Sequence, residues 1–302
     1  MLARGTACEC LGQSRFWSMR VERQTSTRNF SSLDKGGTKL GEGLTRSSLL
    51  ERLEQLGIPV EMREGFPELP DDIEGLLIYG SRARGDHQAE SDLDVLALAS
   101  ESGPTLSSAD VSVAIYTRRQ LSTGIGTLFG AHLKRDSKIV WDPSGEFEAI
   151  VASMGEVDSS RLLARARAMS VLFTTPERDL PKYLPGISRQ ARYLLRSCLY
   201  AQSIAAGKPC FSVRELATRY QDPDLARLLA SRQDDSPSVV DLESCLRRLS
   251  SIVGAFPQNP HGSLEATLVN EWGKPSDVLS MAYMALGLSG GSDYEEVEKI
   301  LL

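Results

Sequence analysis

The sequence predicts an α+β fold in which a small mixed-sheet domain precedes an all-helical domain. Two observations lead to this prediction. Short apolar segments with the alternation typical of strands occur between residues 76 and 141. After about residue 155, apolar residues recur instead at helical spacing. The expected division is a tail over residues 1–43, a mixed-sheet domain over 44–155 and a helical domain over 156–302.

The mixed-sheet domain is expected to begin with a helix near Thr45. An apolar stripe follows from Leu49, and Ser48 with Glu51 has the spacing of a capping box. Four short segments are then expected to be strands: 76–79, 92–98, 111–115 and 138–141.

Helices account for most of the remaining pattern. One is expected over 118–134, although Gly124 and Gly126 weaken its first half. Ser212 and Glu215 form a further capping box, which predicts a helix start. The other expected helices are 162–172, 188–206, 225–229, 239–253 and 278–286.

The composition narrows the classes of protein that fit. Hydrophobic residues make up 41% of the 302 residues and charged residues 25%, which is ordinary for a globular protein. No apolar run is long enough to span a bilayer, so no membrane segment is expected. The net charge of -6 lacks the strong basic excess of duplex-binding proteins, so no duplex nucleic acid is expected as a partner.

The cysteines and the N-terminal tail bear on the cellular compartment of the protein. The five cysteines are odd in number and contain no CxxC pair, which favours a reducing, cytoplasmic setting. Cys198 and Cys245 are expected to be small buried apolar groups. The tail over residues 1–43 is rich in Arg and Ser and is expected to be disordered. An organellar targeting segment is the alternative interpretation of this tail.

The segment Gly80-Ser81-Arg82-Ala83-Arg84-Gly85 directly follows the first predicted strand. A glycine at such a turn accepts a positive φ and lets a ligand approach the backbone closely. A helix that starts there favours an anion such as a triphosphate, and the Ser81 hydroxyl can donate to a phosphate oxygen. Arg82 and Arg84 add positive charge, although either could simply face solvent. Gly80, Ser81, Arg82 and Arg84 are therefore candidate nucleotide-binding residues.

Three carboxylates follow this segment. Asp92 and Asp94 are two residues apart on a predicted strand, so both side chains should project from the same face. A divalent cation between them removes the repulsion of two like charges. Asp110 begins the next predicted strand and is expected to complete a cluster of three. An Asp-x-Asp pair alone also occurs on solvated strand edges, so the combination with the Gly80 turn makes the pattern specific.

The motif GSRARGDHQAESDLDV resembles the signature of the minimal nucleotidyltransferases of the DNA polymerase β superfamily. Bacterial aminoglycoside nucleotidyltransferases and the nucleotidyltransferase partners of HEPN toxins are similar here. The resemblance covers about 31 residues, Gly80 to Asp110, with a looser likeness in layout to Trp141. It implies that Gly80 and Ser81 hold nucleotide phosphates, while Asp92, Asp94 and Asp110 bind Mg²⁺ and are catalytic.

The resemblance also implies an activity. We expect transfer of an NMP, with AMP as first choice, from an NTP to a hydroxyl of a small-molecule acceptor, with release of pyrophosphate. ATP is the expected donor and Mg²⁺ the expected cofactor. Two alternatives stay open: NMP transfer to a protein or tRNA, as in a toxin–antitoxin system, and a catalytically silent nucleotide-binding module.

Overall fold

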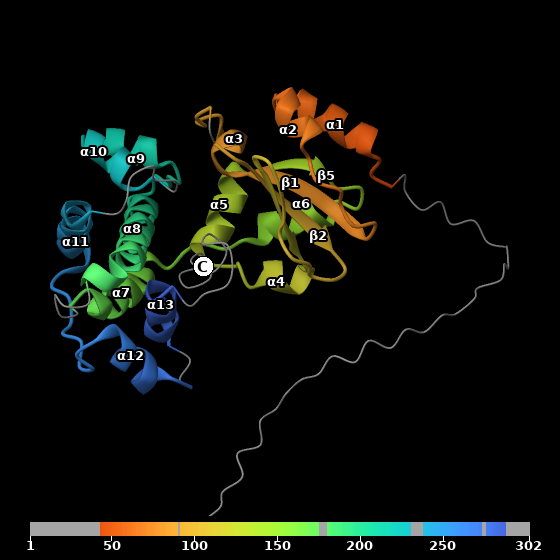
Figure 1. The fold of residues 1–302 in the computed structure, drawn as a ribbon. Helices are drawn as coiled ribbons and strands as arrows, with labels where there is room; N and C mark the ends of the chain where they lie inside the picture. Colours follow the sequence, from red (N-terminus) through yellow and green to blue (C-terminus); the bar gives the residue numbers. More distant parts are fainter. Residues whose placement is uncertain (1–42, 90, 175–179, 231–237, 274–275, 288–302) are drawn as a thin grey trace, which may run out of the picture. The chain divides into compact units, whose positions relative to one another are not determined.

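The structure is a computed structural model that describes the chain except for residues 1–42, 90, 175–179, 231–237, 274–275 and 288–302 (Figure 1). The predicted tail over 1–43 therefore lies outside the described residues, apart from Gly43. The described residues belong to one compact unit. The domain limits at 155 and 156 within that unit remain a prediction.

One mixed sheet of five strands forms the first half, with the strand order β3-β4-β2-β1-β5. The strands are β1 (Ile73–Tyr79), β2 (Leu93–Ala99), β3 (Leu106–Ser108), β4 (Val111–Tyr116) and β5 (Lys138–Trp141). The pair β2–β4 is parallel, and the other pairs are antiparallel. All four predicted strands are confirmed. The sequence analysis missed β3, because three residues with two serines give too short a pattern to recognise.

Six helices accompany these strands, and one of them, α3, is a short helix that begins at a glycine. They are α1 (Arg46–Gln55), α2 (Val60–Glu64), α3 (Gly80–Arg84), α4 (Arg118–Ser122), α5 (Leu128–Asp136) and α6 (Glu146–Ser153). The helix expected over 118–134 is wrong as a single element, because Gly126 has a φ of 75° and the chain turns between α4 and α5. The cap of α1 is Thr45, whose side chain accepts from the Ser48 N–H, so the expected cap at Ser48 is one helical turn too late.

In the described residues of the second half only helices follow, which confirms the predicted fold class. They are α7 (Ser159–Met169), the 3₁₀ turn η1 (Ser170–Thr174), α8 (Leu180–Ala205), α9 (Val213–Arg219), α10 (Pro223–Leu228), α11 (Val239–Val253), α12 (Leu264–Glu271) and α13 (Asp277–Ala285). The helix α8 starts eight residues before the predicted Ser188. Pro185 and Gly186 hid this start, since both residues normally argue against a helix interior.

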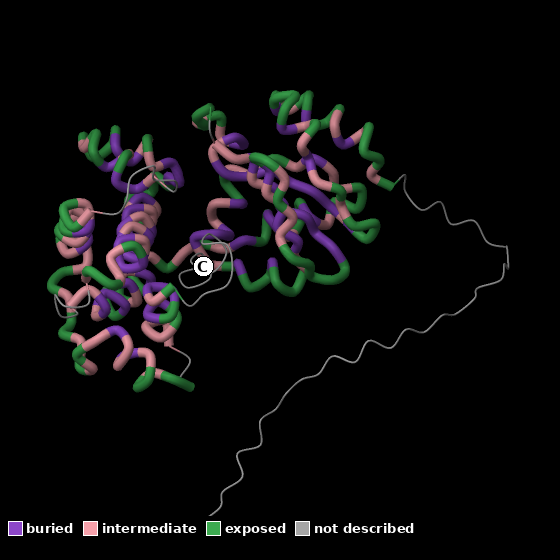
Figure 2. The backbone as a smooth tube through the Cα atoms, viewed as in Figure 1, coloured by how far each residue is buried: buried purple, intermediate pink, exposed green. Residues whose placement is uncertain are grey.

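The two faces of the sheet are covered by different helices. Leu53 of α1 and Met62 of α2 pack with one face, where Val95 points. Phe129 of α5 packs with the opposite face, where Leu96 points. The central strands are accordingly the most continuously buried part of this half (Figure 2). Because side chains alternate along a strand, Asp94 belongs to the face that α5 covers.

A separate hydrophobic cluster surrounds α8 in the helical half. Cys198 and Cys245 lie in it as free, buried thiols, which confirms their expected apolar role. Burial raises the pKa of both thiols to about 12, so they stay protonated and unreactive. Among the helices that the structure describes, none has the length and apolar character needed to cross a bilayer.

Candidate functional site

Gly80 lies directly against the carboxylate of Asp94. The antiparallel register of β1 and β2 sets Tyr79 opposite Asp94, and the chain turns into α3 at the next residue. Gly80 has a φ of 76°, and a methyl group on its Cα would overlap Oδ2 of Asp94. Both the backbone conformation and the close approach therefore require glycine at this position.

Asp92 and Asp94 form a pair of interacting carboxylates at the start of β2. Asp94 is half-buried, and its pKa is raised to about 7. Burial is the main cause, the charge of Asp92 raises the pKa further, and the charge of Arg84 opposes both. The structure thus brings together the turn and two of the three predicted carboxylates.

Asp110 differs from the other two predicted carboxylates. It is exposed and lies in the turn between β3 and β4, after Ala109, whose φ is 48°. Its backbone carbonyl accepts from the N–H of Leu93 at 2.7 Å. In the register of β2 and β4, the residue beside Asp94 is Ser112. The described part of the chain contains no group of three His, Cys, Asp or Glu side chains that could hold a metal ion. Asp110 nevertheless directly precedes Val111, the partner of Leu93 in the parallel pair of β2 and β4, and its place in the site stays a prediction.

Arg82 is hydrogen-bonded to backbone carbonyls within the motif itself. Its side chain is buried, with 8% of the residue exposed. Nε donates to the carbonyl of Ser91 at 2.8 Å, and a terminal nitrogen donates to the carbonyl of Ala89 at 3.2 Å. These bonds hold the segment that leads into β2. They give Arg82 a structural role, and its contact with nucleotide stays a prediction.

Arg84 remains close to the carboxylate pair. Its charge acts on the pKa of Asp94, and only 14% of its side chain is exposed. Nε donates to Oδ1 of Asp86 at 3.2 Å, and one terminal nitrogen lies 2.8 Å from Nε2 of His132. The same terminal nitrogen is 3.6 Å from Oδ2 of Asp136. The guanidinium is thus held between α3 and α5.

His132 is a residue of this region that the sequence analysis missed. Its ring lies 5.0 Å from the Phe211 ring, nearly parallel to it, and meets the Tyr79 ring edge-on at 6.1 Å. Its pKa is lowered to about 3, chiefly by burial and further by the charges of Arg84, Arg135 and Arg196. His132 is consequently neutral. Its only local signal is the four-residue spacing to Asp136 on α5, which is common on helix faces.

Ser81 is half-buried in the first turn of α3. Its carbonyl accepts from the N–H groups of Gly85 and Asp86, at 2.9 and 3.1 Å. Gly85 closes the turn with a φ of 83°. These bonds fix Ser81 next to Gly80 at the head of the motif.

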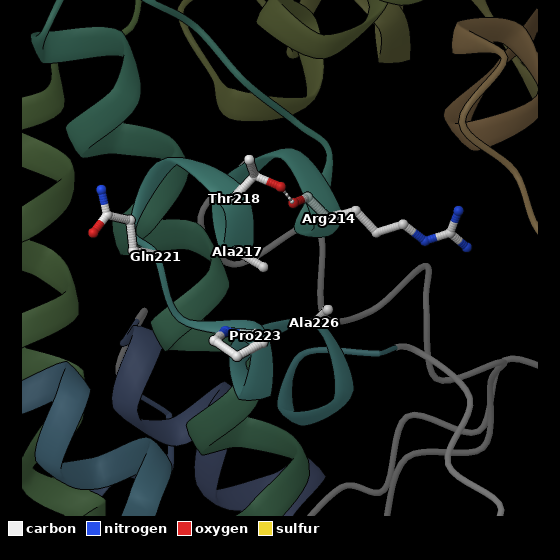
Figure 3. Close-up of a pocket in the computed structure, with 6 residues that line it drawn as sticks. All are labelled: Arg214, Ala217, Thr218, Gln221, Pro223 and Ala226. Atoms are coloured by element: carbon white, nitrogen blue, oxygen red, sulfur yellow. Dashed lines mark hydrogen bonds between the residues drawn. The ribbon is translucent and has the colours of Figure 1, made fainter.

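A pocket of about 430 Å³ lies elsewhere, on α9 and α10 (Figure 3). Its lining residues are Arg214, Ala217, Thr218, Gln221, Pro223 and Ala226. The Arg214 side chain extends away from the other five, and its guanidinium donates to the carbonyl of Asp86 at 2.8 Å. Its described lining residues include no predicted site residue and no carboxylate, thiol or imidazole.

Comparisons with known proteins give weak similarities. No protein-family model matches this chain, and no curated protein sequence matches it. A chain in a crystal structure of a toxin-antitoxin with AMP-PNP is 16% identical, with a TM-score of 0.22 over 35% of this chain and 82% of that one. A nucleotidyltransferase-like protein from Exiguobacterium sibiricum 255-15 is 13% identical, with a TM-score of 0.29 over 68% of this chain and 74% of that one. Similarity at this level supports no statement about the activity of this chain.

Proposed function

We propose that this chain is a Mg²⁺-dependent nucleotidyltransferase that uses an NTP, with ATP as the expected donor. The observation that carries the proposal is the contact of Gly80 with the Asp94 carboxylate. That contact joins a turn suited to phosphates with a pair of carboxylates that repel each other. A phosphate bound together with its cation would relieve this repulsion and lie against the turn at Gly80.

The donor set fits Mg²⁺. This cation prefers oxygen ligands and is usually held by one or two carboxylates together with substrate phosphates. Asp92 and Asp94 would supply the carboxylates. When bound, Mg²⁺ would neutralise charge on the phosphates during transfer. The exposed Asp110 is not included in this proposal, because the described residues form no cluster of three ligands.

Three further residues of the motif would have defined roles. Gly80 leaves room for the Asp94 carboxylate next to the backbone, which a side chain would displace. The positive φ of Gly80 would present the turn to a phosphate. Ser81 would donate its hydroxyl to a phosphate oxygen. Arg84 would offset negative charge on the phosphates of the bound nucleotide. At the α-phosphate, the acceptor oxygen would form a new bond as the bond to pyrophosphate breaks. Positioning and charge would then supply most of the rate.

For the acceptor, we propose a small hydroxylated molecule. The test is incubation of the full chain with ATP labelled at the α-phosphate and Mg²⁺, against a panel of aminoglycosides and other polyols. Parallel arms contain total tRNA and a protein extract. Label on a small molecule supports the proposal, whereas label on tRNA or protein alone assigns the other acceptor class. A D92A/D94A variant that still transfers label contradicts the assignment of the site.

A second candidate function is nucleotide binding without catalysis. The observation in its favour is that Ser112, and not a carboxylate, lies beside Asp94 on β4. Titration with a non-hydrolysable ATP analogue, next to an assay of pyrophosphate release, separates the two functions. Binding without release across the whole acceptor panel would favour the binding module.

A further inference from the structure

We propose that His132 is a positioning residue that holds the Arg84 guanidinium toward the Asp92–Asp94 pair, through a neutral ring nitrogen. The inference rests on the proposed function, because it assigns Arg84 to the phosphates of the bound nucleotide. It adds a residue from α5, outside the sequence motif, to the site. Three observations carry it: two concern contacts of the His132 ring, and the third concerns the charges around Arg84.

The first observation is the contact between the two side chains. A terminal nitrogen of Arg84 lies 2.8 Å from Nε2 of His132, within hydrogen-bond distance. An arginine side chain has donors only, so Nε2 must be the ring nitrogen that accepts. The proton of the neutral ring is then on Nδ1. The low pKa of His132 agrees with this assignment.

The second observation is that the ring itself is held on two sides. Phe211 stacks on it with ring centroids 5.0 Å apart and planes 27° apart. Tyr79 meets it with ring planes 77° apart. Tyr79 is also the residue opposite Asp94 in the sheet. The acceptor nitrogen is therefore fixed relative to the strand that carries the carboxylate.

The third observation is the charge around Arg84. Asp86 and Asp136 already lie within 3.2 and 3.6 Å of its guanidinium. If an acidic residue replaced His132, it would add a third negative charge next to Arg84, and this charge would repel the proposed anionic ligand. A neutral acceptor orients the guanidinium and leaves its positive charge available to Asp94 and to a phosphate.

The test uses the full chain and a non-hydrolysable ATP analogue with Mg²⁺, titrated by calorimetry. H132F keeps an aromatic ring for Phe211 but removes the acceptor, and we expect about tenfold weaker binding. H132Q keeps a neutral acceptor and should bind within about threefold of the wild type. H261L removes a part-buried histidine whose Nε2 lies 3.2 Å from Glu271 in the helical half, and it should leave binding unchanged. If H132F does not fold, H132L replaces it as the variant without an acceptor.

A double-mutant cycle with R84Q sharpens the result. If His132 acts through Arg84, R84Q/H132F binds about as weakly as R84Q alone. With transfer as the readout, H132F should raise KM for ATP about tenfold and change kcat less than about threefold. Wild-type affinity in H132F, or H132Q as weak as H132F, overturns the inference alone. No binding of the analogue by the wild type overturns the proposed function, and the inference with it.

Discussion

The two strand ends that carry the predicted carboxylates differ in how the chain reaches them. At the β1–β2 end, Gly80 and Asp94 are pressed together across adjacent strands, and Asp94 is half-buried. At the β3–β4 end, Asp110 lies in an exposed turn, after a residue with positive φ. Spacing along one strand therefore determines on which face of the sheet a side chain lies. It does not determine the backbone conformation of the turn before the next strand.

Asp94 should show the largest effect of any single change at these two ends. Asn keeps the volume of the side chain but removes its charge, so D94N should reduce transfer from ATP on the order of a thousandfold. The measurement is the initial rate at saturating Mg²⁺ and ATP. An equal loss in D110N would contradict the difference between the two ends.

Substitution of Gly80 should have the second-largest effect, because it disturbs both the backbone turn and the Asp94 carboxylate. G80A must place a methyl group against Asp94 and keep a φ of 76°, so we expect about a hundredfold weaker binding of the ATP analogue. G57A is the matched control. Gly57 has a φ of 77° with nothing near its added methyl group, so this variant should lose about 1 kcal/mol of stability and keep binding. Equal binding in the two variants would show that the contact with Asp94 has no functional role.

Substitution of Arg82 tests how much its buried hydrogen bonds stabilise the fold. R82Q leaves the carbonyls of Ala89 and Ser91 without their buried donor, so the free energy of unfolding should fall by about 1–3 kcal/mol. The control is R118Q, since the half-exposed Arg118 pairs with Glu74 and Glu146 on the surface. Loss of such surface pairs costs about 0–1 kcal/mol. Urea denaturation of both variants measures the difference, and a larger loss in R118Q would contradict the role given to Arg82.

The smallest expected effect is at Asp110. Its side chain is exposed, and its contact with β2 is made by the backbone carbonyl, which D110N keeps. We therefore expect D110N to change the transfer rate and the affinity for the ATP analogue by less than about twofold. A loss beyond about tenfold in either quantity would return Asp110 to the site.

The sequence was sufficient for the features that depend on local pattern. Alternation along the strand of Asp94 predicts its face, and the glycine after a strand predicts a turn with positive φ at Gly80. The close approach of the Asp94 carboxylate to Gly80 was not predicted, because it depends on the register of two strands. The hydrogen-bond partners of Arg82 and Arg84 could not be predicted, because nothing in the motif distinguishes two arginines whose neighbours in space are unknown. His132 was missed for the same reason: Phe211 and Tyr79 reach its ring from distant parts of the chain.

Calorimetric titration of a non-hydrolysable ATP analogue, with Mg²⁺ and with EDTA, tests the central claim most directly. Wild-type protein should bind the analogue at least about tenfold more tightly with Mg²⁺, because Asp92 and Asp94 would share the cation with its phosphates. The D92N/D94N variant should lose that Mg²⁺ dependence. The same gain from Mg²⁺ in both proteins would contradict the account, since the cation would then bind without the two carboxylates.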